Sequence, residues 1–232
     1  MSKTSDILIF DMDGVLVEVT ESYRETICQT VKHFAGQTIS RDLVQDYKNQ
    51  GGWNNDWLLS EKILKDLGHP IPFDDVKEQF NVIFFGNVVD GIPDGLMARE
   101  QWLPQPGLLE KLAAKYHLAI FTGREHDEAM MTLMRFAPQI PFQPLLAADH
   151  GHAAKPAPDG LLHIAKMFPQ AEPWYVGDTV DDARSARAAG VPFIGIAAPG
   201  VPQRESLLGL FEQEGALHIL ENINQLPGVL LT

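Results

Sequence analysis

The fold of this sequence is decided by one stretch, Ile7-Leu8-Ile9-Phe10-Asp11-Met12-Asp13-Gly14-Val15-Leu16. Four apolar residues of strand type lead into two acids, one residue apart, and then into a turn with a glycine. Because side chains alternate along an extended chain, Asp11 and Asp13 share one side wherever the chain stays extended. Two carboxylates past the end of a buried strand are costly unless a cation neutralises them. The alternative is a turn in which each Asp bonds its own backbone, and this stretch alone leaves both interpretations open.

The bulk composition limits the kinds of partner. The chain has 232 residues, enough for one large domain or two small ones, and a hydrophobic fraction of 45% that is typical of a globular protein. Its formal net charge of −13 speaks against nucleic acid or an anionic membrane as a partner, because phosphate contacts need clustered Lys and Arg. A phosphate site must therefore be built from local positive groups or a metal ion.

Cysteine usage and hydropathy indicate the compartment. The single cysteine, Cys28, can form no disulfide within the chain, which fits a reducing environment. No signal peptide is visible, and no apolar run approaches the length of a membrane span. We expect a soluble cytoplasmic protein with no membrane partner; the sequence does not indicate its oligomeric state.

Short apolar runs alternate with helical patterns over much of the chain. Strands separated by helices of this length are joined by crossovers into a parallel sheet with helices on both faces, so the expected fold class is α/β. The expected strands are Ile7–Phe10, Leu118–Thr122, Pro144–Ala147, Trp174–Gly177, Phe193–Ile196 and, more weakly, Ala216–Leu220. The expected helices between them are Leu108–Tyr116, Glu125–Phe136, Asp159–Phe168, Asp182–Ala189 and Arg204–Glu214.

Residues 18–95 have a different pattern, with helical periodicity throughout and no convincing strand. We interpret them as an all-helical domain inserted after the first strand, with residues 1–17 and 96–232 forming the core. The segments Val15–Thr20 and Pro93–Gly107 connect the two and are the expected hinge. The expected helices of the insertion are Tyr23–Ala35, Arg41–Tyr47, Trp57–Leu67 and Phe73–Val89, separated by Gly, Pro or Asn.

The two acids of the first strand suit phosphate ester hydrolysis. The ends of strands in an open parallel sheet form its ligand crevice. There, Asp11 can attack phosphorus and form an aspartyl-phosphate. Asp13 can protonate the leaving alkoxide and then deprotonate the attacking water. The pKa values of two neighbouring acids tend to be pushed apart, which suits one ionised and one protonated group.

Two further strand ends offer groups for the phosphate. At Thr122-Gly123-Arg124, the Thr122 hydroxyl and the N–H of Gly123 or Arg124 can contact phosphate oxygens, although an ordinary helix N-cap has the same pattern. Lys155, biased toward an extended backbone by Pro156, can balance the carboxylate and phosphoryl charges in the transition state. The alternative for Lys155 is a surface lysine that precedes a helix.

A fourth strand end indicates a metal ion. The run Trp174–Gly177 is followed by Asp178, Asp181 and Asp182. Mg²⁺ prefers oxygen ligands, a few carboxylates and retained waters, and Asp178 with the Asp11 carboxylate and the Asp13 carbonyl would meet that need. Acids at a helix N-terminus also favour the helix dipole, which is the alternative for Asp181 and Asp182.

Together these motifs resemble those of the haloacid dehalogenase-like hydrolases, in the family's order and at suitable spacing. The resemblance covers Asp-x-Asp-Gly-Val-Leu at Asp11–Leu16, Thr-Gly-Arg at Thr122–Arg124, Lys-Pro-x-Pro-Asp at Lys155–Asp159 and Gly-Asp-Thr-x-x-Asp at Gly177–Asp182. Pro104–Gly107 resembles the segment that leads back from the family's cap domain. The resemblance implies a Rossmann-like core with a helical C1 cap, as in phosphoglycolate phosphatases and β-phosphoglucomutases.

The resemblance also implies roles for the motif residues. Asp11 would be the nucleophile, Asp13 the acid and base, and Thr122 and Lys155 the contacts to the phosphate. Mg²⁺ would be held by Asp11, Asp13, Asp178 and Asp182, the last of which would support the metal's waters or orient Lys155.

Residues that differ within the family favour a phosphatase. The family's dehalogenases lack the second acid of the first motif, whereas Asp13 is present here. Phosphonate-cleaving relatives use a cap lysine, but neither Lys32 nor Lys48 lies in a recognisable motif. Mutases of the β-phosphoglucomutase type carry a basic residue in a cap loop that has none here beyond Lys48. A mutase, and a non-catalytic binding module on the same fold, remain the alternatives, the latter at odds with the complete set of site residues.

The same cap loop is a candidate for reading the leaving group. The glycines permit unusual backbone angles, and Gly52, Trp53, Asn54 and Asn55 offer stacking and amide hydrogen bonds to a small phosphorylated metabolite. The alternative is a turn in which Asn55 caps the next helix. Phosphoglycolate, a sugar phosphate, a nucleotide or an amino-alcohol phosphate all fit the core. The Arg124 side chain could bind the substrate's phosphate or lie at the surface at the helix start, and the sequence does not decide its role or those of His150, His152 and Asp181.

Overall fold

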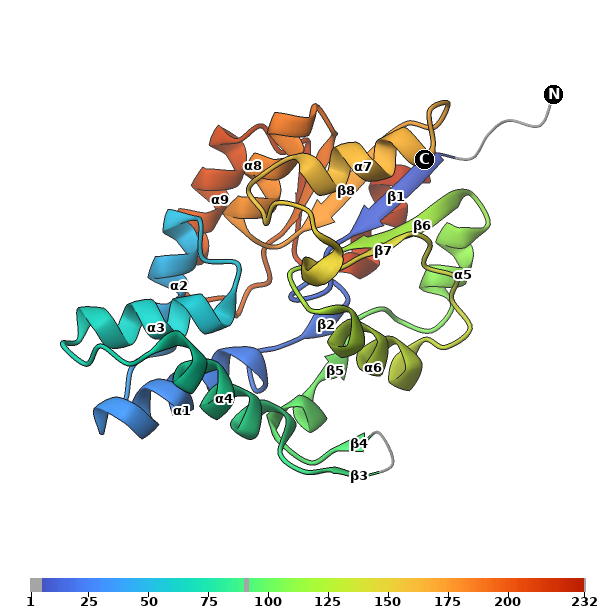
Figure 1. Ribbon diagram of the computed structural model, residues 1–232. Coiled ribbons are helices and arrows are strands. Elements are labelled where there is room, and N and C mark those ends of the chain that lie inside the picture. Colours follow the sequence, from blue (N-terminus) through green and yellow to red (C-terminus); the bar gives the residue numbers. More distant parts are fainter. Residues whose placement is uncertain (1–5, 90–91, 232) are drawn as a thin grey trace. The chain divides into compact units, whose positions relative to one another are not determined.

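The computed structural model describes residues 6–89 and 92–231 (Figure 1). The chain divides into two compact units, one formed by the residues up to Val17 with those from Trp102 onward, the other by Glu18–Gln101. The short strands β2 (Val17–Glu18) and β5 (Gln101–Trp102), where the chain passes between the units, pair with each other. The second unit runs past residue 95 because the 3₁₀ turn η1 (Leu96–Arg99) packs against its helices. The assignment of independent domains stays a prediction.

The core unit is built on a six-stranded sheet in the order β10-β9-β8-β1-β6-β7, with parallel neighbours. The predicted α/β class with a parallel sheet is confirmed. The central strand β1 pairs with β6 on one side and β8 on the other, so that Phe10 lies opposite Ile120 and Val176. The strands are β1 (Asp6–Phe10), β6 (Tyr116–Phe121), β7 (Leu145–Leu146), β8 (Pro173–Gly177), β9 (Phe193–Ile196) and β10 (His218–Leu220).

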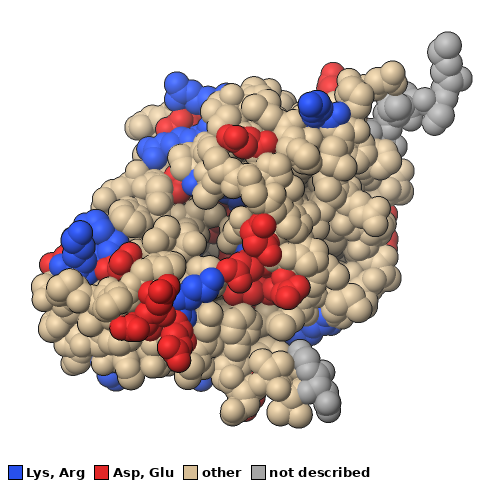
Figure 2. Space-filling model, viewed as in Figure 1, with Lys and Arg blue, Asp and Glu red and all other residues tan. Residues whose placement is uncertain are grey.

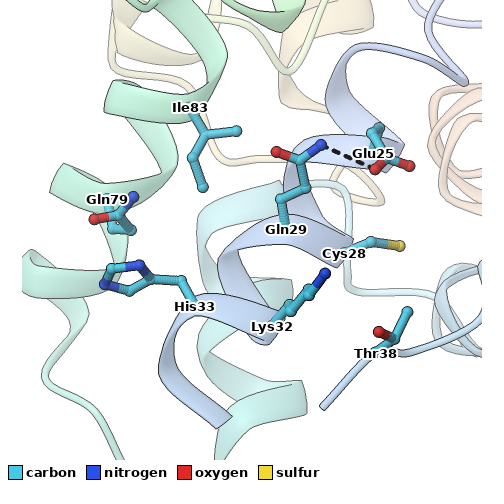
Figure 3. Close-up of a pocket in the computed structure, with 8 residues that line it drawn as sticks. All are labelled: Glu25, Cys28, Gln29, Lys32, His33, Thr38, Gln79 and Ile83. Carbon is cyan, nitrogen blue, oxygen red and sulfur yellow. Dashed lines mark hydrogen bonds between the residues drawn. The ribbon is translucent and has the colours of Figure 1, made fainter. Parts of the chain in front are cut away.

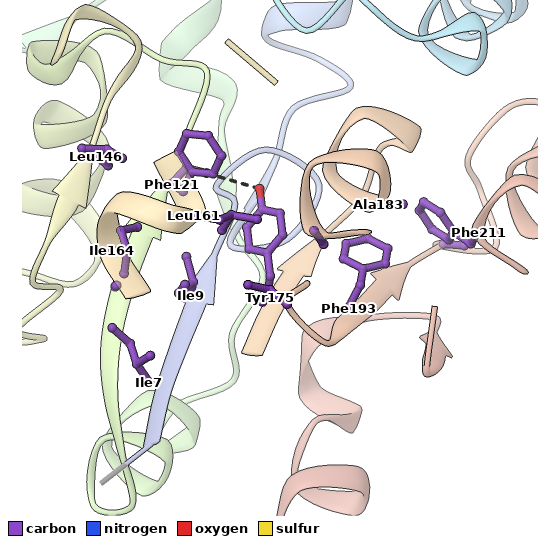
Figure 4. Packing of buried hydrophobic residues seen from close by; sticks show 14 of the residues in the cluster. Ile7, Ile9, Phe121, Leu146, Leu161, Ile164, Tyr175, Ala183, Phe193 and Phe211 are labelled. Carbon is purple, nitrogen blue, oxygen red and sulfur yellow. Dashed lines mark hydrogen bonds between the residues drawn. The ribbon is translucent and has the colours of Figure 1, made fainter. Parts of the chain in front are cut away.

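Helices cover both faces of this sheet, which explains why β1 is apolar at every buried position. Ile7 and Ile9 face a cluster that includes Leu161, Ala183 and Phe211 from three helices (Figure 4). Phe10 belongs to the opposite face, where its ring meets that of Phe142 edge-on at 6.2 Å between centroids. The helices of the core are α5 (Leu108–Ala113), α6 (His126–Phe136), α7 (Asp159–Met167), α8 (Val180–Ala189), α9 (Arg204–Gln213) and α10 (Pro227–Leu230), with 3₁₀ turns η2 (Ala148–His150) and η3 (Ile223–Gln225).

The inserted unit is a helical bundle. Its centre is aromatic, with the ring of Tyr23 4.1 Å from that of Phe84 and 6.3 Å from that of Phe80. Ser40 caps the second helix by accepting a hydrogen bond from the Leu43 N–H. Its helices are α1 (Tyr23–Ala35), α2 (Arg41–Gln50), α3 (Asp56–Asp66) and α4 (Phe73–Phe85).

One part of the insertion differs from the all-helical prediction. Helix α4 ends at Phe85 instead of Val89, and β3 (Val88–Val89) pairs antiparallel with β4 (Ile92–Pro93). Gly86 has φ 63°, and a Cβ on it would lie 2.6 Å from the backbone nitrogen of Gly95. Glycine at this position therefore lets the chain leave the helix and come close to its returning segment.

The surface reflects the excess of acids. On the face shown in Figure 2, Asp and Glu side chains form several groups with Lys and Arg beside them. Of the helices in residues 6–89 and 92–231, none is both long and apolar enough to cross a lipid bilayer.

Candidate active site

Three strand ends of the core unit meet at one place. Asp11 follows β1, Thr122 follows β6 and Asp178 follows β8. The Asp11 N–H donates to the Val176 carbonyl at 2.8 Å, so the chain stays in register with the sheet up to Asp11 itself. The parallel order of the strands therefore gathers residues that are far apart in the sequence, as the crevice of such sheets requires.

The turn after β1 allows Asp178 to approach. The Met12 carbonyl accepts the N–H groups of Leu16 and Val17 at 2.8 and 2.9 Å, which closes the turn. Gly14 lies in it with φ 70°, and a Cβ there would lie 2.9 Å from the Asp178 Cβ and closer still to its carboxylate. Glycine is thus required both by the backbone angle and by the space that Asp178 occupies.

Lys155 lies between two carboxylates. Its Nζ is 3.0 Å from Asp11 Oδ1 and 2.7 Å from Asp182 Oδ1, and the side chain is 1% exposed. The ammonium also lies over the rings of Phe121 and Tyr175, 4.9 and 5.5 Å from their centroids. Burial alone would lower the pKa of Lys155, but Asp11 and Asp182 outweigh it and raise that pKa, so the lysine stays charged.

Asp182 is held on both oxygens. Its Oδ1 accepts the Tyr175 hydroxyl at 2.6 Å beside Lys155, and its Oδ2 accepts the Thr179 N–H and hydroxyl at 3.0 and 2.7 Å. Burial would raise the pKa of Asp182, yet Lys155 and these hydrogen bonds together lower it. An ionised Asp182 with four partners is therefore well suited to fix Lys155.

Tyr175 is a residue of the site that sequence reasoning missed. It lies in an apolar strand run and packs in the core cluster, where Figure 4 also shows its hydroxyl near the Phe121 carbonyl. Burial beside Asp182 raises the pKa of Tyr175, so its hydroxyl stays protonated and donates. The signal available in the sequence was that a buried tyrosine hydroxyl needs a partner.

Asp11 is buried among like charges. It is 3% exposed, and its Oδ1 accepts the Met12 N–H at 2.7 Å. Burial raises the pKa of Asp11 well above the ordinary value, Lys155 opposes this, and Asp182, Asp178 and Asp13 add to it. An ionised Asp11 therefore needs a further cation.

The residues present fit such a cation. Asp11, Asp178 and Asp182 each offer a carboxylate oxygen within 4.8 Å of the others; within the described part of the chain, no other three His, Cys, Asp or Glu side chains come together in this way. Hard divalent cations prefer this all-oxygen donor set. The group can therefore bind a metal ion. Asp11 and Asp178 are its better ligands, because both oxygens of Asp182 already accept hydrogen bonds.

Thr122 presents its hydroxyl at the end of β6. The side chain is buried, and Oγ1 accepts the Arg124 N–H at 3.2 Å. Because the oxygen serves as the acceptor there, the hydroxyl hydrogen remains to be donated elsewhere. Gly123, between them, is partly exposed. This arrangement is compatible with the predicted phosphate contacts of Thr122 and Gly123, which stay predictions.

Arg124 points into the protein. Its Nε and Nη2 donate to Asp13 Oδ1 at 2.8 and 2.5 Å, and its Nη1 donates to Thr132 Oγ1 at 2.7 Å. The side chain is 1% exposed. From the sequence, Arg124 could approach the phosphate or lie at the surface at the helix start; in this geometry its guanidinium contacts Asp13 and Thr132 instead.

The sequence model of the family described as haloacid dehalogenase-like hydrolase matches residues 6–190. This chain belongs to the haloacid dehalogenase-like hydrolases. The match confirms the resemblance that the four motifs indicated and extends it across the inserted unit.

Two curated relatives have different names. An imidazoleglycerol-phosphate dehydratase of Phytophthora nicotianae is 29% identical to this hydrolase over 235 residues, which cover 95% of this chain and 51% of that protein. This chain thus spans about half the length of that relative. A phosphoglycolate phosphatase of Rhodobacter capsulatus is 22% identical over 191 residues, which cover 81% of this chain and 82% of that protein.

Solved structures share the fold across both units. A protein of Haemophilus somnus predicted to be a phosphoglycolate phosphatase has a TM-score of 0.73 at 19% identity, with 99% of each chain covered. A proposed β-phosphoglucomutase of Thermotoga maritima has a TM-score of 0.64 at 19% identity and covers 97% of this chain and 98% of its own. This hydrolase therefore has the family's core with a helical cap inserted after the first strand.

The candidate cap loop is partly structural. The Asn55 side chain accepts the Leu58 N–H at 3.0 Å and so caps α3, as the alternative interpretation had it. Trp53 packs edge-on against Tyr47, with ring centroids 6.2 Å apart. Gly52 has φ 81°. A contact of Gly52, Trp53, Asn54 or Asn55 with a substrate stays a prediction.

The contacts of the cap lysines add no support for phosphonate cleavage or for a mutase, the two activities of the family that use a basic residue of the cap. Lys48 pairs with Asp56 at 2.7 Å within the cap, where both side chains are nearly buried. Lys32 lines a hollow of about 650 Å³ between α1 and α4 (Figure 3), in which Gln29 donates to Glu25 at 3.0 Å. Burial raises the pKa of Cys28, in the same hollow, to about 11, so this thiol is not a nucleophile near neutral pH.

Asp181, His150 and His152 do not belong to the acidic group of Asp11, Asp178 and Asp182. Asp181 is buried in the first turn of α8. The ring of His150 lies 5.1 Å from that of His126, and the ring of His152 lies 4.7 Å from that of His163, both in tilted orientations. These are two separate pairs, and the structure adds no role for them.

Proposed function

We propose that this hydrolase cleaves a small phosphate monoester with Mg²⁺, by way of an aspartyl-phosphate on Asp11. One observation carries the proposal: the buried Asp11 carboxylate lies at the end of the central strand, 3.0 Å from the Lys155 ammonium and grouped with Asp178 and Asp182. A carboxylate nucleophile beside a fixed cation is what phosphoryl transfer to the protein needs.

Mg²⁺ is the ion we assign to the acidic group, because it prefers a few carboxylates and retained waters. Asp11, Asp178 and the Asp13 carbonyl would hold it, and Asp182 would keep Lys155 in place. When bound, the ion supplies positive charge against the carboxylates and the phosphoryl oxygens.

The chain's own residues then divide the reaction into two steps. In the first, an Asp11 oxygen forms a bond to phosphorus, the ester P–O bond breaks, and the leaving oxygen takes a proton from Asp13. In the second, Asp13 takes a proton from the water that attacks phosphorus, and the bond between Asp11 and phosphorus breaks. Thr122, the Gly123 N–H and Lys155 bind the phosphoryl oxygens in both steps.

The relatives support two kinds of leaving group. The Rhodobacter relative is named for phosphoglycolate, whose leaving group carries a carboxylate. The Phytophthora relative is named for imidazoleglycerol phosphate, a phosphate monoester whose phosphate a dehydration leaves in place. This chain corresponds to about half of that protein. We therefore propose two classes of substrate: phosphate monoesters of imidazole-bearing alcohols, and 2-phosphoglycolate. An imidazole would suit stacking on Trp53.

The test is phosphate release from a panel of monoesters that contains both kinds, with Mg²⁺ or with EDTA. We expect Mg²⁺-dependent release from one or a few members, lost in Asp11→Asn and retained in Asp127→Asn, a surface acid at the start of α6. Release that persists in Asp11→Asn contradicts the mechanism. Turnover that requires an added sugar bisphosphate and returns the phosphate to sugar would favour the mutase instead.

A further inference from the structure

Arg124 and Asp13 form a fixed pair within the core unit. The guanidinium places Nε and Nη2 on the same carboxylate oxygen, Asp13 Oδ1, at 2.8 and 2.5 Å. The Asp13 side chain is 30% exposed, whereas the guanidinium is almost fully buried. The Asp13 carboxylate is therefore bonded to the buried guanidinium through Oδ1, while part of the side chain stays accessible.

The third arm of the guanidinium anchors it to α6. Nη1 donates to Thr132 Oγ1 at 2.7 Å, and Thr132 is itself buried on the inner face of that helix. The Arg124 N–H also bonds Thr122 Oγ1, so backbone and side chain are both fixed. A planar guanidinium held on two sides permits little rotation. Asp13, bonded to it twice, is restricted in the same way.

We infer that Arg124 is a positioning residue for the acid and base of the reaction, and that it selects Asp13 Oδ2 as the oxygen that exchanges the proton. This inference rests on the proposed function. Within residues 6–89 and 92–231, the side-chain hydrogen bonds recorded for Asp13 both fall on Oδ1. Oδ2 therefore gives its proton to the leaving oxygen as the ester P–O bond breaks, and takes one from water in the second step.

This assignment predicts a selective defect. A loose Asp13 still leaves Asp11 able to attack phosphorus, so esters whose leaving groups depart without a proton should react almost normally. Esters with basic leaving groups need the proton in the transition state, where general acid catalysis contributes about 10²–10⁴-fold. A role in binding the phosphate, or in folding alone, would lower the rates of all esters alike.

The experiment measures kcat/KM, which reports formation of the aspartyl-phosphate, for p-nitrophenyl, phenyl and benzyl phosphate in Mg²⁺. The ratio for p-nitrophenyl over benzyl phosphate should rise about 100-fold in Arg124→Gln relative to the natural protein. Asp13→Asn should show the same steep dependence. Arg135→Gln is the matched control, because it removes an exposed guanidinium from α6, the helix that carries Thr132.

Two further variants keep the test decisive. Arg124→Lys retains the charge without the fork and should raise the ratio by an intermediate amount. Thr132→Val keeps the side-chain shape, removes the anchor of Nη1 and should raise the ratio about fivefold even if Arg124→Gln does not fold. An unchanged ratio in the folded variants overturns the role of Arg124. No phosphate release from the natural protein, or full activity of Asp11→Asn, overturns the proposed function and the inference with it.

Discussion

Replacing Lys155 with methionine tests the electrostatic account of the site. The ammonium lies 3.0 Å from Asp11 Oδ1 and 2.7 Å from Asp182 Oδ1, with the side chain 1% exposed. At an effective dielectric constant of about 20, these separations correspond to attractions of roughly 5.5 and 6 kcal/mol. Most of that gain is offset by the desolvation of three charged groups. Removing one partner of a buried ion pair costs about 3–5 kcal/mol, because it leaves uncompensated charge behind.

We expect Lys155→Met to lower the free energy of unfolding by about 3–5 kcal/mol at pH 7.5 in EDTA. Burial raises the pKa of Asp11 above its unfolded value even beside Lys155, and removing the lysine raises this pKa further. An acid with a raised folded-state pKa loses stability as the pH rises through that pKa, so the deficit should be smaller at pH 5.5 than at pH 7.5. Activity should be lost at both pH values.

Urea unfolding followed by circular dichroism measures the deficit at each pH. Lys166→Met is the matched control, since this exposed lysine lies in the last turn of α7 and should change stability by no more than about 0.5 kcal/mol. A Lys155→Met protein within about 1 kcal/mol of the natural one at both pH values would refute the reasoning, because the carboxylates would then not depend on the lysine.

Three other substitutions test separate parts of the structure. Tyr175→Phe removes a hydrogen bond to an ionised carboxylate and should cost about 2 kcal/mol in urea unfolding; an unchanged midpoint would contradict this. Burial raises the pKa of Glu128 from 4.5 to about 7, so its ionisation destabilises the fold as the pH rises between these values. Glu128→Gln should therefore gain stability relative to the natural protein from pH 5 to pH 8, by up to roughly 3 kcal/mol, and a pH-independent difference would exclude this. Gly14→Ala should cost about 1–2 kcal/mol for its left-handed backbone and weaken Mg²⁺ binding by calorimetry at least ~10-fold; unaltered affinity would show that Asp178 does not need the space.

The sequence predicted the strands and helices whose apolar residues recur at a regular spacing. The strand Phe193–Ile196 and the helix Tyr23–Ala35 have the predicted bounds. The parallel sheet then explains why motifs more than 100 residues apart were expected at one edge, because topology alone gathers the ends of β1, β6 and β8.

What the sequence could not predict depends on the direction of single side chains. Arg124 lies just before the N-terminus of α6, where an arginine can point to a ligand, to solvent or inward, and only the position of Thr132 and Asp13 decides among these. Tyr175 looks like any residue of a buried strand until its hydroxyl is seen to reach Asp182.

The helix that was predicted too long shows a second limit. Val88 and Val89 continue an apolar pattern that α4 could have used, and the periodicity alone favoured a helix to Val89. The contact that prevents it, between Gly86 and the returning backbone at Gly95, is not local in the sequence. Asn55 is a similar case, because its capping bond to Leu58 and a contact with a substrate require the same residue type.

The central claim is that Asp11 becomes phosphorylated, and chemical trapping tests it most directly. Asp13→Asn should still attack p-nitrophenyl phosphate in Mg²⁺ but lack the base for the second step, so the phosphorylated protein should accumulate. Borohydride reduction converts an aspartyl-phosphate to homoserine, which mass spectrometry locates in the peptide that contains β1. Homoserine at residue 11 is the result that the account predicts. Phosphate turnover with an unmodified Asp11, or with the modification at another residue, would contradict it.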